Sequence, residues 1–366
     1  MVFNYFNPVE VINTDNWLEE LQSKKEQLNI SSPLFITSPG NRKRFNLDAH
    51  FPPESFFDDV EKNPDFDICA NAVKFCCNKI FDGVLAMGGG SVMDLAKVVM
   101  AHLCLDKSDI HELIAYKEDY PKTLPSIFLP TTHGTASEVT MWGTVWNFKE
   151  RKKYSISHPD LYPSIAILDG NLTLTLPLDI SIITVMDALS HSFESIWNKN
   201  SNPTSTDLAI KAICCILKNV EALKDNPSDL QTRCKLLYAA NIAGLAFSNT
   251  KTAAAHSISY PLTIHHGIPH GVASSISLIP LLEINAHSIQ DSLDTIYEKN
   301  EISFEELISS IKKIPANHIK YNLRNWGVKK SQIGWTAKNS FRSDRVYNNI
   351  VDLTEEDVKR ILNDIY

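Results

Sequence analysis

The chain has 366 residues, of which 43% are hydrophobic and 21% charged, an ordinary composition for a soluble globular protein. At roughly 150 residues per domain, this length predicts about two domains. Lys and Arg number 35 and Asp and Glu 43, so the formal net charge is −8 and nucleic acid is a poor candidate partner. The seven cysteines show no CxxC spacing, so neither a disulfide framework nor a cysteine zinc site is predicted.

The first half of the chain alternates short apolar runs with helical patterns. A turn is expected over 38–44 and a helix over 91–103, where apolar residues recur at helical spacing. Buried strands are expected at 33–38, 83–89, 123–132 and 163–169. Such alternation predicts a Rossmann-like parallel sheet covered by helices.

Strand patterns nearly vanish beyond about residue 180, and helical periodicity replaces them. We therefore predict an α/β domain over 1–178 and an all-helical domain over 179–366, with a cleft between them. The N-terminus shows no secretory signal, and no run approaches the roughly 18 apolar residues that span a bilayer. We expect a cytoplasmic protein with no membrane partner.

Three of the 13 glycines are consecutive, at Gly88, Gly89 and Gly90, between a predicted strand and a predicted helix. Without Cβ atoms, the backbone N–H groups of such a turn can approach a diphosphate, and the helix N-terminus adds its positive dipole end. The spacing is neither GxGxxG nor a P-loop, so a tight turn without a ligand is the alternative.

Four residues favour a metal site. Asp187 and His191 lie one turn apart on a predicted helix, so both side chains can bind one ion. His256 lies on another predicted helix, and His270 in a Pro-His-Gly turn. A carboxylate with three imidazoles suits Fe²⁺, Zn²⁺ or a similar divalent ion. An isolated Asp-x3-His pair is more often a coincidence, whereas the joint pattern favours a metal.

The chain resembles the iron-containing, group III alcohol dehydrogenase family in four segments that follow the family's order and spacing. They are GGGSVMDLAK (88–97), PTTHGTASEVT (130–140), MDALSHSFE (186–194) and IPHGVA (268–273). The resemblance implies an N-terminal dinucleotide-binding domain and a helical, metal-binding C-terminal domain, as in dehydroquinate synthase-like folds. It also implies a homodimer.

The resemblance also implies roles for individual residues. Asp187, His191, His256 and His270 would hold the metal. The cofactor diphosphate would lie against Gly88, Gly89, Gly90 and Ser91, with Asp94 and Lys97 in the same motif. Thr131, Thr132 and Thr135 would line the nicotinamide side.

Cofactor preference depends on Ser38, which stands where NAD-preferring members usually carry Asp. An acidic side chain there would bind the ribose 2′-hydroxyl and repel a 2′-phosphate. Here the neutral Ser38 is followed by Arg42, Lys43 and Arg44, which favours NADP over NAD. The alternative is that this basic run is a solvated loop.

Tyr260 stands four residues after the third expected ligand, where many members carry a histidine implicated in proton transfer. A tyrosine can relay a proton, although its neutral phenol is a poor base at neutral pH. His133 and Ala136 replace smaller residues that are common in the family, which would narrow the pocket.

The segments AAAHSISYPLT and TVWNFKERKKYS look most like the phosphonoacetaldehyde reductase branch of the family. A phosphonate requires cationic or N–H partners. Arg151, Lys152, Lys153 and Lys251 are the candidates, and Trp142 could form a pocket wall. The alternatives are ordinary surface charges and core packing.

These residues predict a metal-dependent hydride transfer between NAD(P)H and a small aldehyde or alcohol. The resemblance to the phosphonoacetaldehyde reductase branch favours the reduction of phosphonoacetaldehyde to 2-hydroxyethylphosphonate. One alternative is a general short-chain alcohol dehydrogenase of the same family. Others are a dehydroquinate synthase-like cyclase, which regenerates its NAD, and a binding protein without catalysis.

Overall fold

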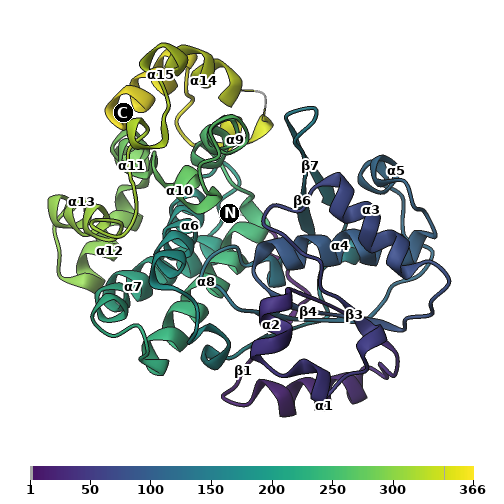
Figure 1. Ribbon diagram of the computed structural model, residues 1–366. Coiled ribbons are helices and arrows are strands. Elements are labelled where there is room, and N and C mark those ends of the chain that lie inside the picture. Colours follow the sequence, from purple (N-terminus) through teal and green to yellow (C-terminus); the bar gives the residue numbers. More distant parts are fainter. Residues whose placement is uncertain (1–2, 342) are drawn as a thin grey trace. The chain divides into compact units, whose positions relative to one another are not determined.

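A computed structural model describes residues 3–341 and 343–366 (Figure 1). The chain divides into two compact units. One is an α/β unit, Pro8–Thr131 with Ala136–Leu172. The other is a helical unit, which contains Thr173–Tyr366, Thr132–Thr135 and the N-terminal segment up to Asn7. A division of the folding domains between 178 and 179 stays a prediction.

The α/β unit contains a six-stranded sheet in the order β1-β8-β5-β4-β2-β3, and every neighbouring pair is parallel. This confirms the predicted fold class. Its strands are β1 (Glu10–Asn13), β2 (Pro33–Thr37), β3 (Phe56–Phe57), β4 (Gly83–Gly88), β5 (Ser126–Pro130) and β8 (Ile165–Leu168). Its helices are α1 (Trp17–Gln27), α2 (Pro39–Arg44), α3 (Phe66–Cys76), α4 (Gly90–Leu105) and α5 (Ile110–Ala115).

The central strands are continuous apolar runs because both of their faces are covered. Along β4, Val84 and Ala86 pack into the core that contains the apolar residues of α3 and α4. Leu85 and Met87 point to the opposite face and join the second core. The four predicted strands are therefore the buried centre of the sheet.

An antiparallel hairpin that the sequence patterns did not reveal follows β5. It pairs β6 (Trp142–Asn147) with β7 (Lys152–Ser157). Its attachment to α4 is close, because a Cβ on Gly143 would lie only 2.9 Å from the carbonyl oxygen of Asp94. The hairpin therefore packs against the helix that follows the glycine turn.

Residues 38–44 are a helix rather than the expected turn. Ser38 caps α2 by accepting a hydrogen bond from the Asn41 N–H at 3.2 Å, and Pro39 occupies the first helical position. Serine followed by proline is typical of a helix start as well as of a turn. Here the pair follows the end of β2 and begins the helix α2.

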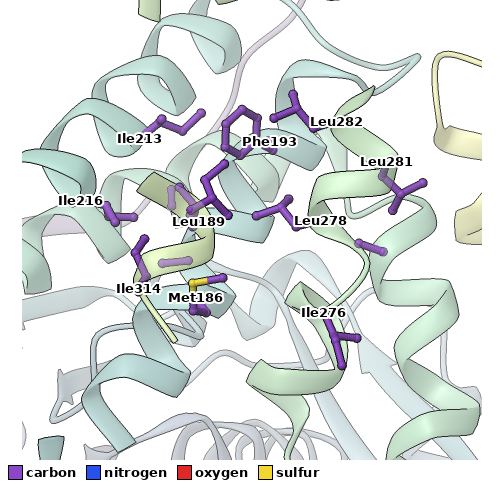
Figure 2. Packing of buried hydrophobic residues seen from close by; sticks show 14 of the residues in the cluster. Met186, Leu189, Phe193, Ile213, Ile216, Ile276, Leu278, Leu281, Leu282 and Ile314 are labelled. Carbon is purple, nitrogen blue, oxygen red and sulfur yellow. The ribbon is translucent and has the colours of Figure 1, made fainter. Parts of the chain in front are cut away.

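The helical unit contains ten α-helices among its described residues. They are α6 (Leu178–Ile196), α7 (Pro203–Asp225), α8 (Leu230–Thr250), α9 (Ala254–His266), α10 (His270–Ser275), α11 (Leu278–Asn285), α12 (Gln290–Asn300), α13 (Phe304–Lys313), α14 (Ile333–Ser340) and α15 (Glu355–Asp364). Figure 2 shows apolar side chains of α6, α7 and α11 meeting in one cluster. Because α6 is buried along most of its length, it can carry polar side chains into the interior.

The segment His270–Asn300 is long and apolar enough to cross a membrane by length and composition alone, which the count of apolar runs did not anticipate. In the structure, 67% of its most apolar stretch is buried inside the protein. A buried core segment passes the same test, so this segment is weak support for a membrane span.

Candidate functional site

The glycine turn joins β4 to the 16-residue helix α4. Gly88 has to be a glycine for packing, because a Cβ there would lie 2.5 Å from Cγ2 of Val92. Gly89 is the N-cap residue of α4, and no side chain caps this helix. The first turn of a 16-residue helix thus begins without a side-chain acceptor, an arrangement that fits a phosphate group.

The neighbouring loop carries the three threonines of the second motif. The Thr131 N–H donates to the Gly88 carbonyl at 3.0 Å, which places Thr131 beside the glycine turn in the α/β unit. Thr132 and Thr135 are half-buried and belong to the helical unit. Between them, Gly134 lies so close to α6 that a Cβ would approach the Thr184 carbonyl oxygen to 2.6 Å.

Asp94 and Lys97 belong to a polar network inside the α/β unit. The Lys97 ammonium is fully buried and donates to the Ser137 carbonyl at 2.7 Å and the Ser137 hydroxyl at 2.8 Å. It also donates to the Thr140 hydroxyl at 3.0 Å and the Trp142 carbonyl at 2.8 Å. Burial lowers the pKa of Lys97 to about 7, against the opposing charge of Asp94.

Asp94 completes this network. Its carboxylate accepts hydrogen bonds from the Ser137 hydroxyl at 2.9 Å and the Thr144 N–H at 3.0 Å. Removal from water raises its pKa, while Lys97 and these two donors act in the opposite direction. Both motif residues therefore tie α4 to the loop before β6 and to the hairpin.

Three of the four expected metal ligands converge in the helical unit. One ligand atom each of Asp187, His256 and His270 lies within 4.8 Å of the other two. Asp187 comes from the buried α6, His256 from the first turn of α9, and His270 from the first residue of α10. The cluster is therefore built where three helices meet.

The fourth expected ligand, His191, lies on the same face of α6, one turn after Asp187. Its ring stacks on Phe247 at 4.1 Å and on His256 at 4.5 Å between centroids. It is buried, and its Nδ1 has no hydrogen-bond partner among the described residues. A buried polar nitrogen without a partner is costly in a folded protein, so this atom fits a ligand that the chain itself does not provide.

The charge of the cluster favours a cation. Burial alone would raise the pKa of Asp187, but the imidazoles of His191, His270 and His256 and the Ser274 hydroxyl outweigh it and lower this pKa to about 2. Asp187 is therefore ionised, and the clustered donors, one carboxylate and two imidazoles with the His191 ring stacked beside them, fit a divalent metal such as Fe²⁺ or Zn²⁺.

Two residues that were assigned no role in the sequence support these ligands. The Ser274 hydroxyl donates to Oδ1 of Asp187 at 2.6 Å. Glu194 hydrogen-bonds to Nδ1 of His256, and its other oxygen accepts the N–H groups of Ala253 at 2.9 Å and His256 at 3.1 Å. Burial raises the pKa of Glu194 to about 7 against these donors. Glu194 therefore orients His256.

A signal for Glu194 was present in the sequence, because it lies three residues after His191 and seven after Asp187. These spacings place all three side chains on one helix face. For Ser274 no such pattern exists, since it reaches Asp187 only because α10 packs against α6. That contact is close, as a Cβ on Gly271 would lie 2.4 Å from the Ile183 carbonyl oxygen.

Tyr260 lies one turn after His256 on α9 and is half-buried. Burial raises its pKa, an effect that Arg345 opposes. The guanidinium carbon of Arg345 lies 5.9 Å from the centre of its ring. The phenol is thus protonated at neutral pH, and it faces a cation.

Ser38 and the basic run after it are only partly available for a ligand. Arg42 pairs with Asp48 at 2.5 Å and Asp58 at 3.1 Å. Lys43 and Arg44 are exposed. Because Arg42 is already paired with two carboxylates, only Lys43 and Arg44 have a positive charge available to bind the 2′-phosphate of NADP.

The four cations proposed for a phosphonate lie on different units. Arg151 and Lys152 are exposed in the β6–β7 hairpin, where Lys152 pairs with Glu150 at 3.1 Å. Lys153 lies over the ring of Trp146 at 5.6 Å. Lys251 is exposed in the helical unit, directly after α8.

His133 is fully buried, and neither ring nitrogen has a hydrogen-bond partner among the described residues. Burial, with a contribution from the charge of Arg233, lowers its pKa to about 3. His133 is therefore a neutral, space-filling side chain between the threonines.

Comparison with known proteins matches the two halves of the chain to one family. Residues 8–170 match the model for iron-containing alcohol dehydrogenase, and residues 181–366 match the C-terminal model of the same family. The chain therefore belongs to the iron-containing alcohol dehydrogenase family, as its motifs predicted.

Individual relatives show which members it is similar to. It is 34% identical to long-chain-alcohol dehydrogenase 1 of Geobacillus thermodenitrificans over 66% of this chain and 60% of that protein. It is 32% identical to phosphonoacetaldehyde reductase of Streptomyces viridochromogenes over 56% of this chain and 53% of that protein. The matches thus span between half and two thirds of the length of these two relatives.

Among solved structures, the chain is similar to sulfoacetaldehyde reductase of Bifidobacterium kashiwanohense in complex with NAD+. The TM-score is 0.90 at 29% identity, covering 100% of this chain and 99% of that chain. This similarity supports the dehydroquinate synthase-like arrangement of an α/β part followed by a helical part.

Proposed function

We propose that this protein is a metal-dependent oxidoreductase that transfers a hydride between a nicotinamide cofactor and a small aldehyde or alcohol. The observation that carries the proposal is the buried cluster of Asp187, His256 and His270, whose ligand atoms lie within 4.8 Å of one another. Family membership supports the same reaction class.

Asp187, His191, His256 and His270 would hold the metal. When bound, a divalent ion supplies a Lewis acid that polarises a carbonyl group. Glu194 keeps the Nδ1 edge of His256 occupied, so its Nε2 faces the cluster. Asp187 is held by Ser274 and stays ionised, which provides the negative charge that a cation requires.

The cofactor would lie with its diphosphate at Gly88, Gly89, Gly90 and Ser91, and with its nicotinamide along Thr131, Thr132 and Thr135. Ser91 and Thr131 have defined places in this arrangement: Ser91 accepts the Asn63 N–H at 3.1 Å, and Thr131 is bound to Gly88. Asp94 and Lys97 would act indirectly, by holding the loop at Ser137. The neutral Ser38 with Lys43 and Arg44 favours NADP.

Tyr260 would hold or donate a proton near the reacting oxygen rather than accept one, because its pKa is raised by burial. The substrate would be an acid aldehyde, with phosphonoacetaldehyde reduced to 2-hydroxyethylphosphonate. Two similar proteins bear names of acid aldehyde reductases, one for a phosphonate and one for a sulfonate. A general short-chain alcohol dehydrogenase is the alternative within the family.

The test is a panel of aldehydes with NADH and NADPH, followed by the loss of reduced-cofactor absorbance. Net oxidation of the cofactor with an aldehyde is expected, together with loss of turnover on chelation and recovery with Fe²⁺ or Zn²⁺. A cyclase regenerates its cofactor, so absence of net oxidation with every aldehyde would exclude the dehydrogenase. Light scattering of the same preparation tests the predicted homodimer.

A further inference from the structure

Lys251 has a strained backbone that its main-chain hydrogen bonds fix in place. Its φ is 63° and its ψ 179°, a region almost restricted to glycine. Its N–H donates to the Phe247 carbonyl at 2.8 Å, and its carbonyl accepts from Nδ2 of Asn198 at 3.1 Å. No ion pair of the described residues uses its ammonium group. A glycine would satisfy the backbone without strain, so the lysine side chain itself needs an explanation.

A second cation contacts Thr252, the residue that follows Lys251. Arg345, in the short helix η9 (Asp344–Asn348), donates from Nη1 to the hydroxyl of Thr252 at 2.8 Å. Asn348 donates to the carbonyl of the same Thr252 at 2.9 Å. Arg345 is half-buried and forms no salt bridge within 4 Å among residues 3–341 and 343–366, although its charge acts at longer range on the buried Glu194 carboxylate. Most of its five N–H donors are therefore available for a ligand.

These two cations lie at the start of the helix that carries a metal-ligand candidate. The next residue after Thr252 is Ala253, whose N–H donates to Glu194 at 2.9 Å, and the N–H of His256 donates to the same oxygen at 3.1 Å. Arg345 also faces the ring of Tyr260, one turn further along α9. Lys251 and Arg345 thus flank the segment that positions His256, within one unit of the protein.

We propose that Lys251 and Arg345 bind the acid group of an anionic aldehyde whose carbonyl lies at the Asp187–His256–His270 cluster. A phosphonate or sulfonate has three oxygens, which an arginine can bind in pairs while a lysine provides a point charge. This inference rests on the proposed function and deepens it by naming the residues that select the substrate class.

The cations of the β6–β7 hairpin are weaker candidates for the same role. Lys152 already pairs with Glu150, and Lys153 lies over Trp146 and near Asp94. Arg151 also has a positive φ, of 52°, but it lies in the α/β unit rather than in the unit that contains the Asp187–His256–His270 cluster. Among the cations considered for the acid group, Lys251 and Arg345 therefore combine available donors with a place beside a ligand-bearing helix.

The experiment compares the metal-loaded wild-type protein with Lys251→Gly, Arg345→Gln and Arg345→Lys. For each, kcat/KM is measured with phosphonoacetaldehyde, sulfoacetaldehyde and the neutral propanal. Lys251→Gly and Arg345→Gln are each expected to lower the ratio of anionic to neutral kcat/KM by about 10-fold to 100-fold, mainly through KM. Arg345→Lys should recover part of the loss. A larger effect on one acid shows whether a phosphonate or a sulfonate is the better ligand.

A stability measurement separates binding from structure. Because Gly accepts φ 63°, Lys251→Gly should raise the apparent Tm by about 1 °C, whereas Lys251→Ala should not. Lys235→Ala, at an exposed lysine of α8, the helix that Lys251 follows, is the charge control and should leave the ratio unchanged. A Tm increase with an unchanged ratio would overturn the proposal. Failure of every aldehyde to oxidise the cofactor in the wild-type protein would instead overturn the proposed function.

Discussion

The two units each bury a charged cluster, and the clusters differ in how completely the chain satisfies them. In the α/β unit, Lys97 finds four oxygen acceptors, and Asp94 finds two donors. In the helical unit, the stacked His191 keeps a buried Nδ1 without a partner among the described residues. A saturated network holds elements together, whereas an unsaturated one fits a ligand that comes from outside the chain.

The largest effect should follow from Asp187→Ala, which removes the anionic member of the unsaturated cluster. We expect loss of bound metal and a fall in kcat/KM of at least about a thousandfold, since several kcal/mol of charge stabilisation depend on the ion. Elemental analysis and cofactor oxidation measure the two effects. Asp207→Ala, at an exposed position of α7, is the control. Full turnover of Asp187→Ala with metal retained would contradict the claim that the cluster around Asp187 binds the metal.

A substitution in the hydrogen-bonded network of Asp94 and Lys97 should lower the stability of the protein rather than its metal content. Lys97→Met would leave the oxygens of Ser137, Thr140 and Trp142 without their donor, at a cost of about 2–4 kcal/mol in the free energy of unfolding. Urea denaturation followed by circular dichroism measures it. The exposed Lys74→Met on α3 should change this free energy little. Equal stability of the two variants would show that the network does not hold the hairpin.

An intermediate effect is expected for Glu194→Gln, which belongs to the metal cluster but acts through His256. The amide keeps the shape of the side chain but not its charge, so His256 loses basicity and orientation. We expect metal affinity to fall by about 10-fold to 100-fold. Competition with a fluorescent chelator measures this affinity independently of turnover. An unchanged affinity would show that Glu194 serves only to cap the start of α9.

The sequence predicted the elements whose signal is local. The four central strands are continuous apolar runs, and the metal-ligand candidates fall in short motifs, so both were visible in the sequence. The β6–β7 hairpin carries neither a continuous apolar run nor a clear apolar–polar alternation, because β6 (WGTVWN) mixes aromatic and small residues and β7 (KKYSIS) is mostly polar. Ser-Pro-Gly is typical of both a turn and a helix start, so the sequence alone predicts a turn where the helix α2 forms.

Contacts distant in sequence explain the rest of what was missed. Ser274 lies 87 residues from Asp187, and Arg345 lies 93 residues from Thr252. Neither has a periodic relation to its partner, so only the packing of the helices brings them together. Glu194, by contrast, shares a helix face with Asp187 and His191, and a helical wheel alone would have found it.

His133 offers the most specific test, because it is a buried polar group that the protein keeps neutral and its effect within any one pH unit is small. Its pKa of about 3 lies below the ordinary value of 6.5, so between these two pH values the unfolded chain binds more protons than the folded one. Stability from this group is therefore present above pH 6.5 and lost as the pH falls, by about 1.4 kcal/mol for each pH unit. His133→Ala should flatten the dependence of the unfolding free energy on pH between about 4 and 6.5. The exposed His50→Ala is the control. An unchanged slope of the unfolding free energy against pH would mean that His133 gains a proton in the folded protein as readily as in the unfolded chain. His133 would then not be a buried group that the fold keeps neutral.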